Sequence, residues 1–218
     1  MGKYEAVIFD LDGTLLNTLE DLADSVNVAL ANYHYPEKTL DQIRSYVGNG
    51  IQKLIERCLD RGRENPDFDL IYEAFRNHYK ENCCNKTKPY DGIIDLLCRL
   101  KKQKIKMAIV SNKADFAVKE LNQFFFRDFL MTAIGEQKGI AKKPEPDMVY
   151  QALQELSVPV EHAVYVGDSD VDVKTARRAK IPCISVLWGF RSREFLTQAG
   201  ATCFAATADE LFAILSED

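Results

Sequence analysis

The sequence lacks a long hydrophobic run. Among its 218 residues, no apolar stretch approaches the roughly 18 consecutive residues that a membrane-spanning helix requires. The opening Met1-Gly2-Lys3-Tyr4-Glu5 also lacks a secretory signal, because the apolar run that follows is short and ends in acidic residues. We therefore expect no membrane-embedded part and a cytoplasmic location.

The sequence also lacks the patterns of a metal knuckle and of a nucleic-acid-binding protein. Its six cysteines include the adjacent Cys83 and Cys84 but no Cys-x-x-Cys, and the missing signal favours reduced thiols. The net charge of −5 argues against nucleic acid as the main partner. Hydrophobic residues make up 46%, which suits one globular domain or one domain with a substantial insertion.

Short apolar runs alternate with amphipathic helical patterns along most of the chain. The expected strands are rich in β-branched residues and cover residues 6–10, 106–111, 130–134, 163–167 and 183–187. The expected helices cover residues 92–103, 116–126, 147–156, 171–180 and 192–199, and a last helix opens with the capping box Thr207-x-x-Glu210. This alternation predicts an α/β protein with a doubly wound parallel sheet.

Residues 17–82 interrupt the alternation, because they show helical periodicity and no convincing strand. A helix start is expected at Thr18-x-x-Asp21. We therefore expect an α/β core of residues 1–16 and 83–218, with a helical cap of residues 17–82 inserted after the first strand. Such an insertion would sit over the carboxyl end of that strand, where open α/β sheets bind ligands.

Polar residues gather where the expected strands end. Parallel strands bring these ends to one edge of a sheet, so the residues would share a pocket of several carboxylates, one hydroxyl, one amide and one ammonium. The set consists of Asp10, Asp12, Ser111, Asn112, Lys143, Asp168 and Asp172.

These residue types suit phosphoryl transfer. Clustered carboxylates repel one another, and a hard divalent cation such as Mg²⁺ relieves the repulsion through oxygen ligands. A carboxylate can also act as the nucleophile and form an aspartyl-phosphate, while a second one protonates the leaving alcohol and then activates water. Taken singly, the same residues would only form turns or favour helix starts, as we expect for Asp170.

Four short motifs, in this order, resemble those of the haloacid dehalogenase superfamily. They are Asp10-Leu11-Asp12-Gly13-Thr14, Ser111 after the second strand, Lys143-Pro144 and Gly167-Asp168-Ser169 with Asp172. The helical insertion is similar to the helical cap of that superfamily. The stretches Val47-Gly48-Asn49-Gly50, Ser111-Asn112-Lys113, Lys143-Pro144-Glu145-Pro146 and Trp188-Gly189-Phe190 further resemble the phosphoglycolate phosphatases.

This resemblance implies a role for each catalytic residue. Asp10 would be the nucleophile and Asp12 the general acid and base. Ser111, with Asn112 nearby, would hold the transferring phosphoryl group, and Lys143 would neutralise charge around it. The substrate would be a small phosphorylated metabolite, with 2-phosphoglycolate as the first choice.

The resemblance also implies a metal site. Mg²⁺ would bind Asp10, Asp168 and the backbone carbonyl of Asp12, while Asp172 would support the metal shell or orient Lys143. Gly13 would allow the tight turn that presents Asp12. In the insertion, Gly48, Asn49 and Gly50 form either a substrate-sensing loop or a simple turn between helices.

Other functions stay open at this point. The same core serves pyrophosphatases and β-phosphoglucomutase-like phosphotransferases, and a phosphatase fold that only binds is an alternative from another class. Asp12 argues against dehalogenases and phosphonoacetaldehyde hydrolases, which lack the second aspartate of Asp-x-Asp. Lys53 would act as a Schiff-base lysine only if it were buried with a lowered pKa. The sequence does not distinguish a monomer from a homodimer.

Overall fold

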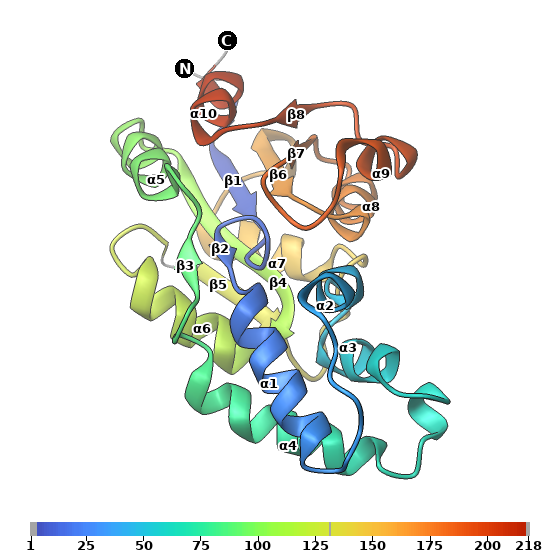
Figure 1. The fold of residues 1–218 in the computed structure, drawn as a ribbon. Coiled ribbons are helices and arrows are strands. Elements are labelled where there is room, and N and C mark those ends of the chain that lie inside the picture. Colours follow the sequence, from blue (N-terminus) through green and yellow to red (C-terminus); the bar gives the residue numbers. More distant parts are fainter. Residues whose placement is uncertain (1–3, 131, 217–218) are drawn as a thin grey trace. The chain divides into compact units, whose positions relative to one another are not determined.

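A computed structural model describes residues 4–130 and 132–216 (Figure 1). The chain divides into two compact units, a sheet unit of Met1–Leu16 with Pro89–Asp218 and a helical unit of Asn17–Lys88. The sequence pattern predicts a return to the core at residue 83, whereas the compact helical unit runs to Lys88. The two crossings lie in β2 (Leu16–Asn17) and β3 (Lys88–Pro89), which pair as a two-stranded sheet.

The sheet unit contains a six-stranded sheet in the order β5-β4-β1-β6-β7-β8. Neighbouring strands run parallel, which confirms the predicted doubly wound parallel sheet. The strands are β1 (Ala6–Phe9), β4 (Lys106–Ala114), β5 (Thr132–Glu136), β6 (Ala163–Gly167), β7 (Cys183–Val186) and β8 (Phe204–Ala205). The two residues of β8 carry too short a pattern to be predicted, and residue 131 of the predicted third strand lies outside the described residues.

Strand β4 runs further than its pattern indicates. The expected strand of residues 106–111 ends at Ser111, whereas β4 also includes Asn112, so neither residue follows the strand. However, β4 pairs with β1 only as far as Ile109, and its register with β5 shifts between Val110 and Ala114. The last residues of β4 therefore extend past the end of β1 and present their side chains at the edge of the sheet.

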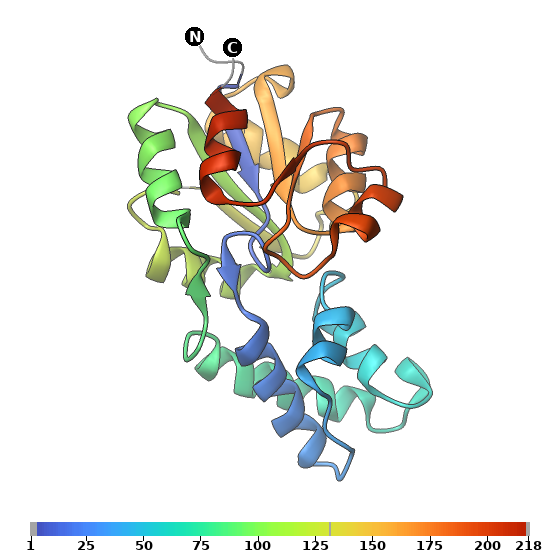
Figure 2. The same ribbon diagram turned by 45° about the horizontal axis from the view of Figure 1, so that its top comes forward.

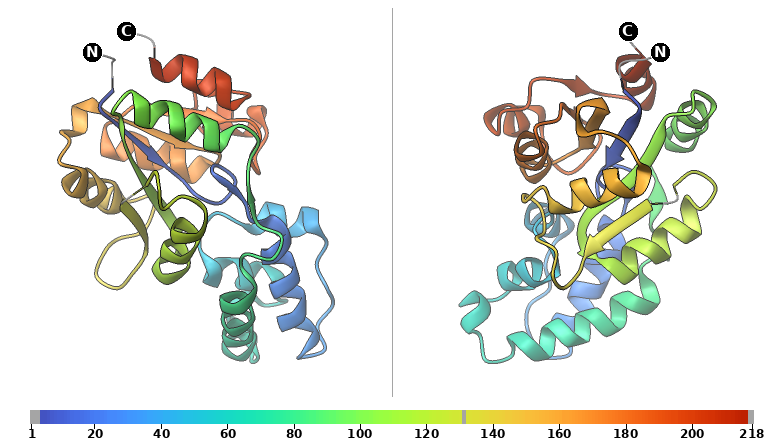
Figure 3. Two further views of the ribbon diagram at one scale, coloured as in Figure 1. Left: turned by 90° about the vertical axis from the view of Figure 1, so that its left-hand side faces the viewer. Right: turned by 180° about the vertical axis from the view of Figure 1, so that it is seen from behind.

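Helices cover both faces of this sheet (Figure 3). They are α5 (Ile93–Lys102), α6 (Asp115–Phe125), α7 (Asp147–Leu156), α8 (Asp170–Ala179), α9 (Arg193–Gln198) and α10 (Ala208–Ser216), with a 3₁₀ turn at Val160–His162. Residues of α7 and α8 join Ala6 and Ile8 of β1 in one buried cluster, while α10 packs against α5. All four β1 side chains are fully buried, as expected for a central strand covered on both faces.

The last helix begins with part of the predicted capping box. The Thr207 hydroxyl accepts a hydrogen bond from the backbone N–H of Glu210 at 3.2 Å. The Glu210 carboxylate accepts from the N–H of Ala206 at 2.7 Å, one residue before the position that a capping box uses.

The helical unit consists of four α-helices and a 3₁₀ turn among the residues that the structure describes. They are α1 (Leu19–Ala31), α2 (Leu40–Tyr46), α3 (Ile51–Cys58), a 3₁₀ turn (Gly62–Glu64) and α4 (Phe68–Asn82). Helices α1 and α4 pack side by side (Figure 2). Their contact buries the predicted apolar faces, which include Leu22 and Val26 of α1 and Ile71 and Phe75 of α4. None of the helices in the described residues is long and apolar enough to cross a lipid bilayer.

Helix α1 begins where the sequence predicts, and Asp21 in its first turn also binds a segment distant in the sequence. Its buried carboxylate accepts hydrogen bonds from the backbone N–H of Lys86, at 3.0 Å to each oxygen, and from that of Thr87 at 2.8 Å. These bonds tie residues 86 and 87 to α1. They are the physical reason why the helical unit extends beyond residue 82.

Candidate active site

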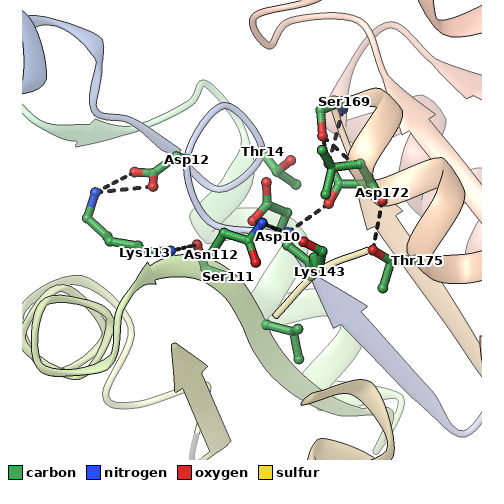
Figure 4. Close-up of polar contacts among 12 residues, drawn as sticks. Asp10, Asp12, Thr14, Ser111, Asn112, Lys113, Lys143, Ser169, Asp172 and Thr175 are labelled. Carbon is green, nitrogen blue, oxygen red and sulfur yellow. Dashed lines mark hydrogen bonds and ion pairs between the residues drawn. The ribbon is translucent and has the colours of Figure 1, made fainter. Parts of the chain in front are cut away.

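Asp10, Lys143 and Asp172 form a buried polar cluster at the carboxyl end of the central strands (Figure 4). The Lys143 Nζ donates to Asp10 Oδ1 and to Asp172 Oδ1, each at 2.8 Å, and contacts the hydroxyl of Tyr165 at 3.0 Å. Asp10 follows β1, whose neighbours are β4 on one side and β6 on the other. The cluster therefore lies where the strand order reverses, the usual position of ligand sites in open α/β sheets.

The backbone explains why these three side chains meet. The N–H of Asp10 donates to Val166 O at 2.9 Å and so continues the pairing of β1 with β6. The Asn112 side chain donates from Nδ2 to the carbonyl oxygen of Lys143 at 2.9 Å. Asn112 thus supports the loop that carries Lys143, a contact that the sequence did not indicate.

Both carboxylate oxygens of Asp172 accept hydrogen bonds. Besides Lys143, Oδ1 accepts from the Tyr165 hydroxyl at 3.2 Å, whereas Oδ2 accepts from the N–H of Ser169 at 3.0 Å and from its hydroxyl at 2.6 Å. Ser169 and Asp172 form the capping box of α8. These bonds favour the predicted role of Asp172 in orienting Lys143 over a role as a direct metal ligand.

Asp168 lies in a narrow backbone cradle. Its Oδ2 accepts from the N–H of Phe190 at 2.6 Å, and its Oδ1 lies 3.5 Å from the Thr14 hydroxyl. A β-carbon at Gly13, where φ is +89°, would lie 2.4 Å from Asp168 Oδ2, and one at Gly189 would lie 2.3 Å from Asp168 Cβ. Both positions therefore require glycine.

Trp188 joins the two loops of this cradle. Its Nε1 donates to the carbonyl oxygen of Thr14 at 2.9 Å. The stretch Trp188-Gly189-Phe190 and the turn after β1 are thus held together around Asp168. Gly189 and the Phe190 N–H are site groups that the sequence reasoning missed, although it had quoted the stretch that contains them.

Asp12 turns toward a second lysine, and not toward Lys143 (Figure 4). The Lys113 Nζ contacts Asp12 Oδ1 at 2.8 Å and Oδ2 at 3.1 Å. The hydroxyl of Ser111 accepts from the backbone N–H of Lys113 at 3.2 Å, which links these two residues at the end of β4. Lys113 is a site residue that the sequence reasoning quoted within Ser111-Asn112-Lys113 but gave no role.

The electrostatics of the cluster suit a divalent cation. Oxygens of Asp10, Asp168 and Asp172 lie within 4.8 Å of one another. Burial, and then the charge of Asp172, raise the pKa of Asp10 to about 7 against the opposing effect of Lys143. Burial followed by the charges of Asp10 and Asp172 raises the pKa of Asp168 well above its ordinary value.

Lys143 does not neutralise this set by itself. Burial lowers its pKa, but Asp10 and Asp172 outweigh that effect and raise the pKa of Lys143 well above its ordinary value, so it stays an ammonium. One ammonium shares the cluster with three buried carboxylates, and the negative charge left on Asp10 and Asp168 suits a divalent metal ion, which prefers hard oxygen ligands. The residues present therefore fit such an ion.

The predicted residues of the insertion belong to the helical unit. Gly48 and Gly50 have φ values of +118° and +85°, and Gly50 precedes the first residue of α3. Asn49 Oδ1 accepts a hydrogen bond from Arg57 Nη2 at 2.8 Å. This bond links the turn between α2 and α3 to helix α3. Lys53 lacks the burial that a Schiff-base role would require, because its side chain is 46% exposed and pairs with Glu56.

Comparison with known proteins identifies the family. The model of the haloacid dehalogenase-like hydrolases matches residues 7–186. A phosphoglycolate phosphatase from Mannheimia succiniciproducens is 33% identical over 87% of this chain and 88% of its own. One from Aquifex aeolicus is 34% identical over 84% of this chain and 85% of its own.

Solved structures agree with this match. A crystal structure from Lactobacillus delbrueckii subsp. bulgaricus, of a protein assigned to the phosphoglycolate phosphatases, shares 34% identity and a TM-score of 0.94 over 100% of both chains. CbbY from Rhodobacter sphaeroides, solved in complex with phosphate, shares 26% identity and a TM-score of 0.77 over 95% of this chain and 96% of its own. The chain belongs to the haloacid dehalogenase-like hydrolase family.

Proposed function

We propose that this protein is a Mg²⁺-dependent phosphomonoester hydrolase whose preferred substrate is 2-phosphoglycolate. The observation that carries the proposal is the buried contact of Lys143 with Asp10 and Asp172, with Asp168 beside them. This arrangement combines a carboxylate nucleophile with an ammonium that can stabilise phosphate oxygens. The choice of 2-phosphoglycolate is supported by the relatives that carry the name phosphoglycolate phosphatase.

In the first half of the proposed reaction, a carboxylate oxygen of Asp10 attacks phosphorus. The bond from phosphorus to the ester oxygen breaks as the bond to Asp10 forms, and Asp12 donates a proton to the departing oxygen. Lys143 stays bound to Asp10 and offers positive charge to the transferring group, which Ser111 and Asn112 help to hold. The product alcohol then departs, and the phosphoryl group remains on Asp10 as an aspartyl-phosphate.

In the second half, water attacks the phosphorus atom of that aspartyl-phosphate. Asp12 takes the proton of the attacking water, and the bond between phosphorus and the Asp10 oxygen breaks, which restores the Asp10 carboxylate. For both steps one Asp12 oxygen must face the reacting oxygen, while the other can keep its contact with Lys113.

The metal ion would be held by Asp10, Asp168 and the backbone carbonyl of Asp12. When bound, Mg²⁺ supplies positive charge that offsets the repulsion between the Asp10 carboxylate and a phosphate dianion. We further propose that the helical unit acts as a cap that selects the leaving group, with Gly48, Asn49 and Gly50 in its substrate-sensing loop.

A panel of phosphate esters tests the proposal. Hydrolysis of p-nitrophenyl phosphate with and without Mg²⁺ separates an enzyme from a binding module, and no turnover with any divalent metal would reject the enzyme. Ranking kcat/KM for 2-phosphoglycolate, sugar phosphates and pyrophosphate then identifies the substrate. A higher rank for pyrophosphate or for a sugar phosphate would replace 2-phosphoglycolate in the proposal.

A further inference from the structure

Lys113 has no assigned role in the chemistry described above, yet it is among the most deeply buried charged side chains of the site. Its side chain is 2% exposed, compared with 14% for its partner Asp12. Figure 4 shows it reaching from the end of β4 to the Asp12 carboxylate, apart from the Lys143 cluster. A buried ammonium beside the proposed general acid lies next to the place where the leaving group must be.

We propose that Lys113 binds a carboxylate of the leaving group and so selects phosphate esters that carry a carboxylate next to the ester oxygen. The proposal rests on the proposed function, because it assumes that Asp12 protonates the ester oxygen. That step requires an Asp12 oxygen within hydrogen-bond distance of the ester oxygen. The same Asp12 oxygens lie 2.8 and 3.1 Å from the Lys113 Nζ.

The covalent structure of 2-phosphoglycolate matches this spacing. A single methylene group separates its ester oxygen from its carboxylate carbon. When Asp12 contacts the ester oxygen, the carboxylate of the substrate is therefore only a few bonds away and can reach a cation that is bound to Asp12. An ammonium has three N–H donors and can bridge two carboxylates. Lys113 can therefore keep one Asp12 oxygen and bind the substrate carboxylate at the same time.

Other cations of the sheet unit are less suited to this task. Lys143 already binds Asp10 and Asp172. Lys142 is 40% exposed and pairs with Glu136. The guanidinium of Arg191 lies over the ring of Phe195, 5.7 Å from its centroid, and is the nearest rival because its charge acts on Asp168.

Burial makes such a contact selective. A hydrogen bond between two charged groups is stronger than one between neutral groups, and a buried pair is screened less than a surface pair. A substrate that carries a methyl group in place of the carboxylate would lose this bond. We expect the loss to cost about 10- to 100-fold in kcat/KM.

The test compares two substrates in several variants of the full chain with Mg²⁺ present. Ethyl phosphate has the skeleton of 2-phosphoglycolate with a methyl group in place of the carboxylate. The measured quantity is the ratio of kcat/KM for 2-phosphoglycolate to kcat/KM for ethyl phosphate. The variants are Lys113→Met, Arg191→Met and the matched control Lys119→Met, which removes a 63%-exposed lysine that also pairs with an aspartate.

The expected result is a fall of about 10- to 100-fold in this ratio for Lys113→Met and no change for the control. An equal loss on both substrates would overturn the proposal, because Lys113 would then only position Asp12. A fall in the ratio for Arg191→Met alone would overturn it as well. Thermal unfolding shows whether Lys113→Met is folded, and Lys113→Gln gives the same test if it is not.

Failure of this inference is distinguishable from failure of the proposed function. If the unmodified chain hydrolyses neither substrate nor p-nitrophenyl phosphate, the phosphatase assignment itself is wrong. If it hydrolyses p-nitrophenyl phosphate but shows no preference for 2-phosphoglycolate over ethyl phosphate, the assignment as a phosphatase stands. The role of Lys113 in binding a carboxylate is then rejected.

Discussion

Each unit of the chain buries aspartates, but in opposite electrostatic settings. In the helical unit, Asp21 is 2% exposed and accepts three hydrogen bonds from the backbone N–H groups of Lys86 and Thr87. In the sheet unit, Asp10 and Asp168 are similarly buried but lie among other carboxylates, and burial followed by these neighbouring charges raises the pKa of both. Burial alone therefore does not distinguish a structural aspartate from a functional one.

The partners make the distinction. Backbone N–H donors satisfy a carboxylate without any further ligand, so Asp21 does not need a cation to offset its charge. Its role is to join two segments of the helical unit. Mutual repulsion among Asp10, Asp168 and Asp172 is only partly offset by Lys143 and leaves negative charge that a metal ion can use. Substitution of Asp10 or Asp168 alters the sheet-unit setting alone, and substitution of Asp21 alters the helical-unit setting alone.

The largest effect is expected from Asp10→Asn. The amide keeps the shape of the side chain but is a poor nucleophile, so kcat should fall by at least about 10⁴-fold. The fold should persist, because the change removes one of three carboxylates that repel one another. Steady-state kinetics with p-nitrophenyl phosphate and a circular dichroism melt measure the two effects, and activity near that of the unmodified chain would refute the nucleophile assignment.

Asp168→Asn should weaken metal binding and lower kcat/KM by about 10²- to 10³-fold. In the unmodified chain, Mg²⁺ at 100 times its dissociation constant should add about 2.7 kcal/mol to the free energy of unfolding, and this gain should shrink in the variant. Melting curves with and without Mg²⁺ measure it. Asp170→Asn is the matched control, because Asp170 pairs with Lys174 on α8 and should leave the Mg²⁺ response intact.

The convergence of Asp10, Lys143 and Asp168 could be predicted because it depends on topology. Apolar β-branched runs indicate parallel strands, and parallel strands place the residues that follow them at one edge. The sequence motifs add the identity of those residues. The order of the elements is sufficient for Asp10 and Asp168, which follow β1 and β6, whereas Lys143 lies in the loop between β5 and α7 and was placed through its motif.

The side-chain pairings at the site could not be predicted in the same way. The contact of Asp12 with Lys113 depends on the shift in register at the end of β4, and the contact of Asn112 with the Lys143 carbonyl depends on the path of a loop. The boundary at residue 88 likewise depends on where the Asp21 carboxylate points. Such features arise from tertiary packing and leave no periodic pattern in the sequence.

Asp21→Asn should affect stability and spare the chemistry. The amide loses the charge that strengthens the bonds to Lys86 and Thr87, and its NH₂ group is a donor that cannot accept from them. The free energy of unfolding should fall by about 1.5 to 3 kcal/mol. Urea denaturation measures this loss, and kcat/KM for p-nitrophenyl phosphate well below the melting temperature should stay within about threefold of that of the unmodified chain. A loss of activity as large as that of Asp168→Asn would remove the contrast between the two aspartates.

The smallest effect concerns two thiols, one from each unit. Burial is the main cause that raises the pKa of Cys58 in the helical unit and of Cys183 in the sheet unit to about 12. Only the thiolate reacts with alkylating agents, so at pH 8 about one molecule in 10⁴ of either thiol would be reactive. Native-state labelling with iodoacetamide, followed by mass spectrometry, should leave buried Cys58 and half-buried Cys183 unmodified, the latter because of its raised pKa, while half-buried Cys98 reacts.

The two units can be compared directly in that labelling experiment. Because burial, and not a neighbouring charge, is the leading cause for both thiols, local opening should control how fast each one reacts. Asp21→Asn weakens only the helical unit and should therefore speed labelling of Cys58 while Cys183 stays protected. Equal acceleration at both cysteines would show that the two units open together, and stability would then be a property of the whole chain.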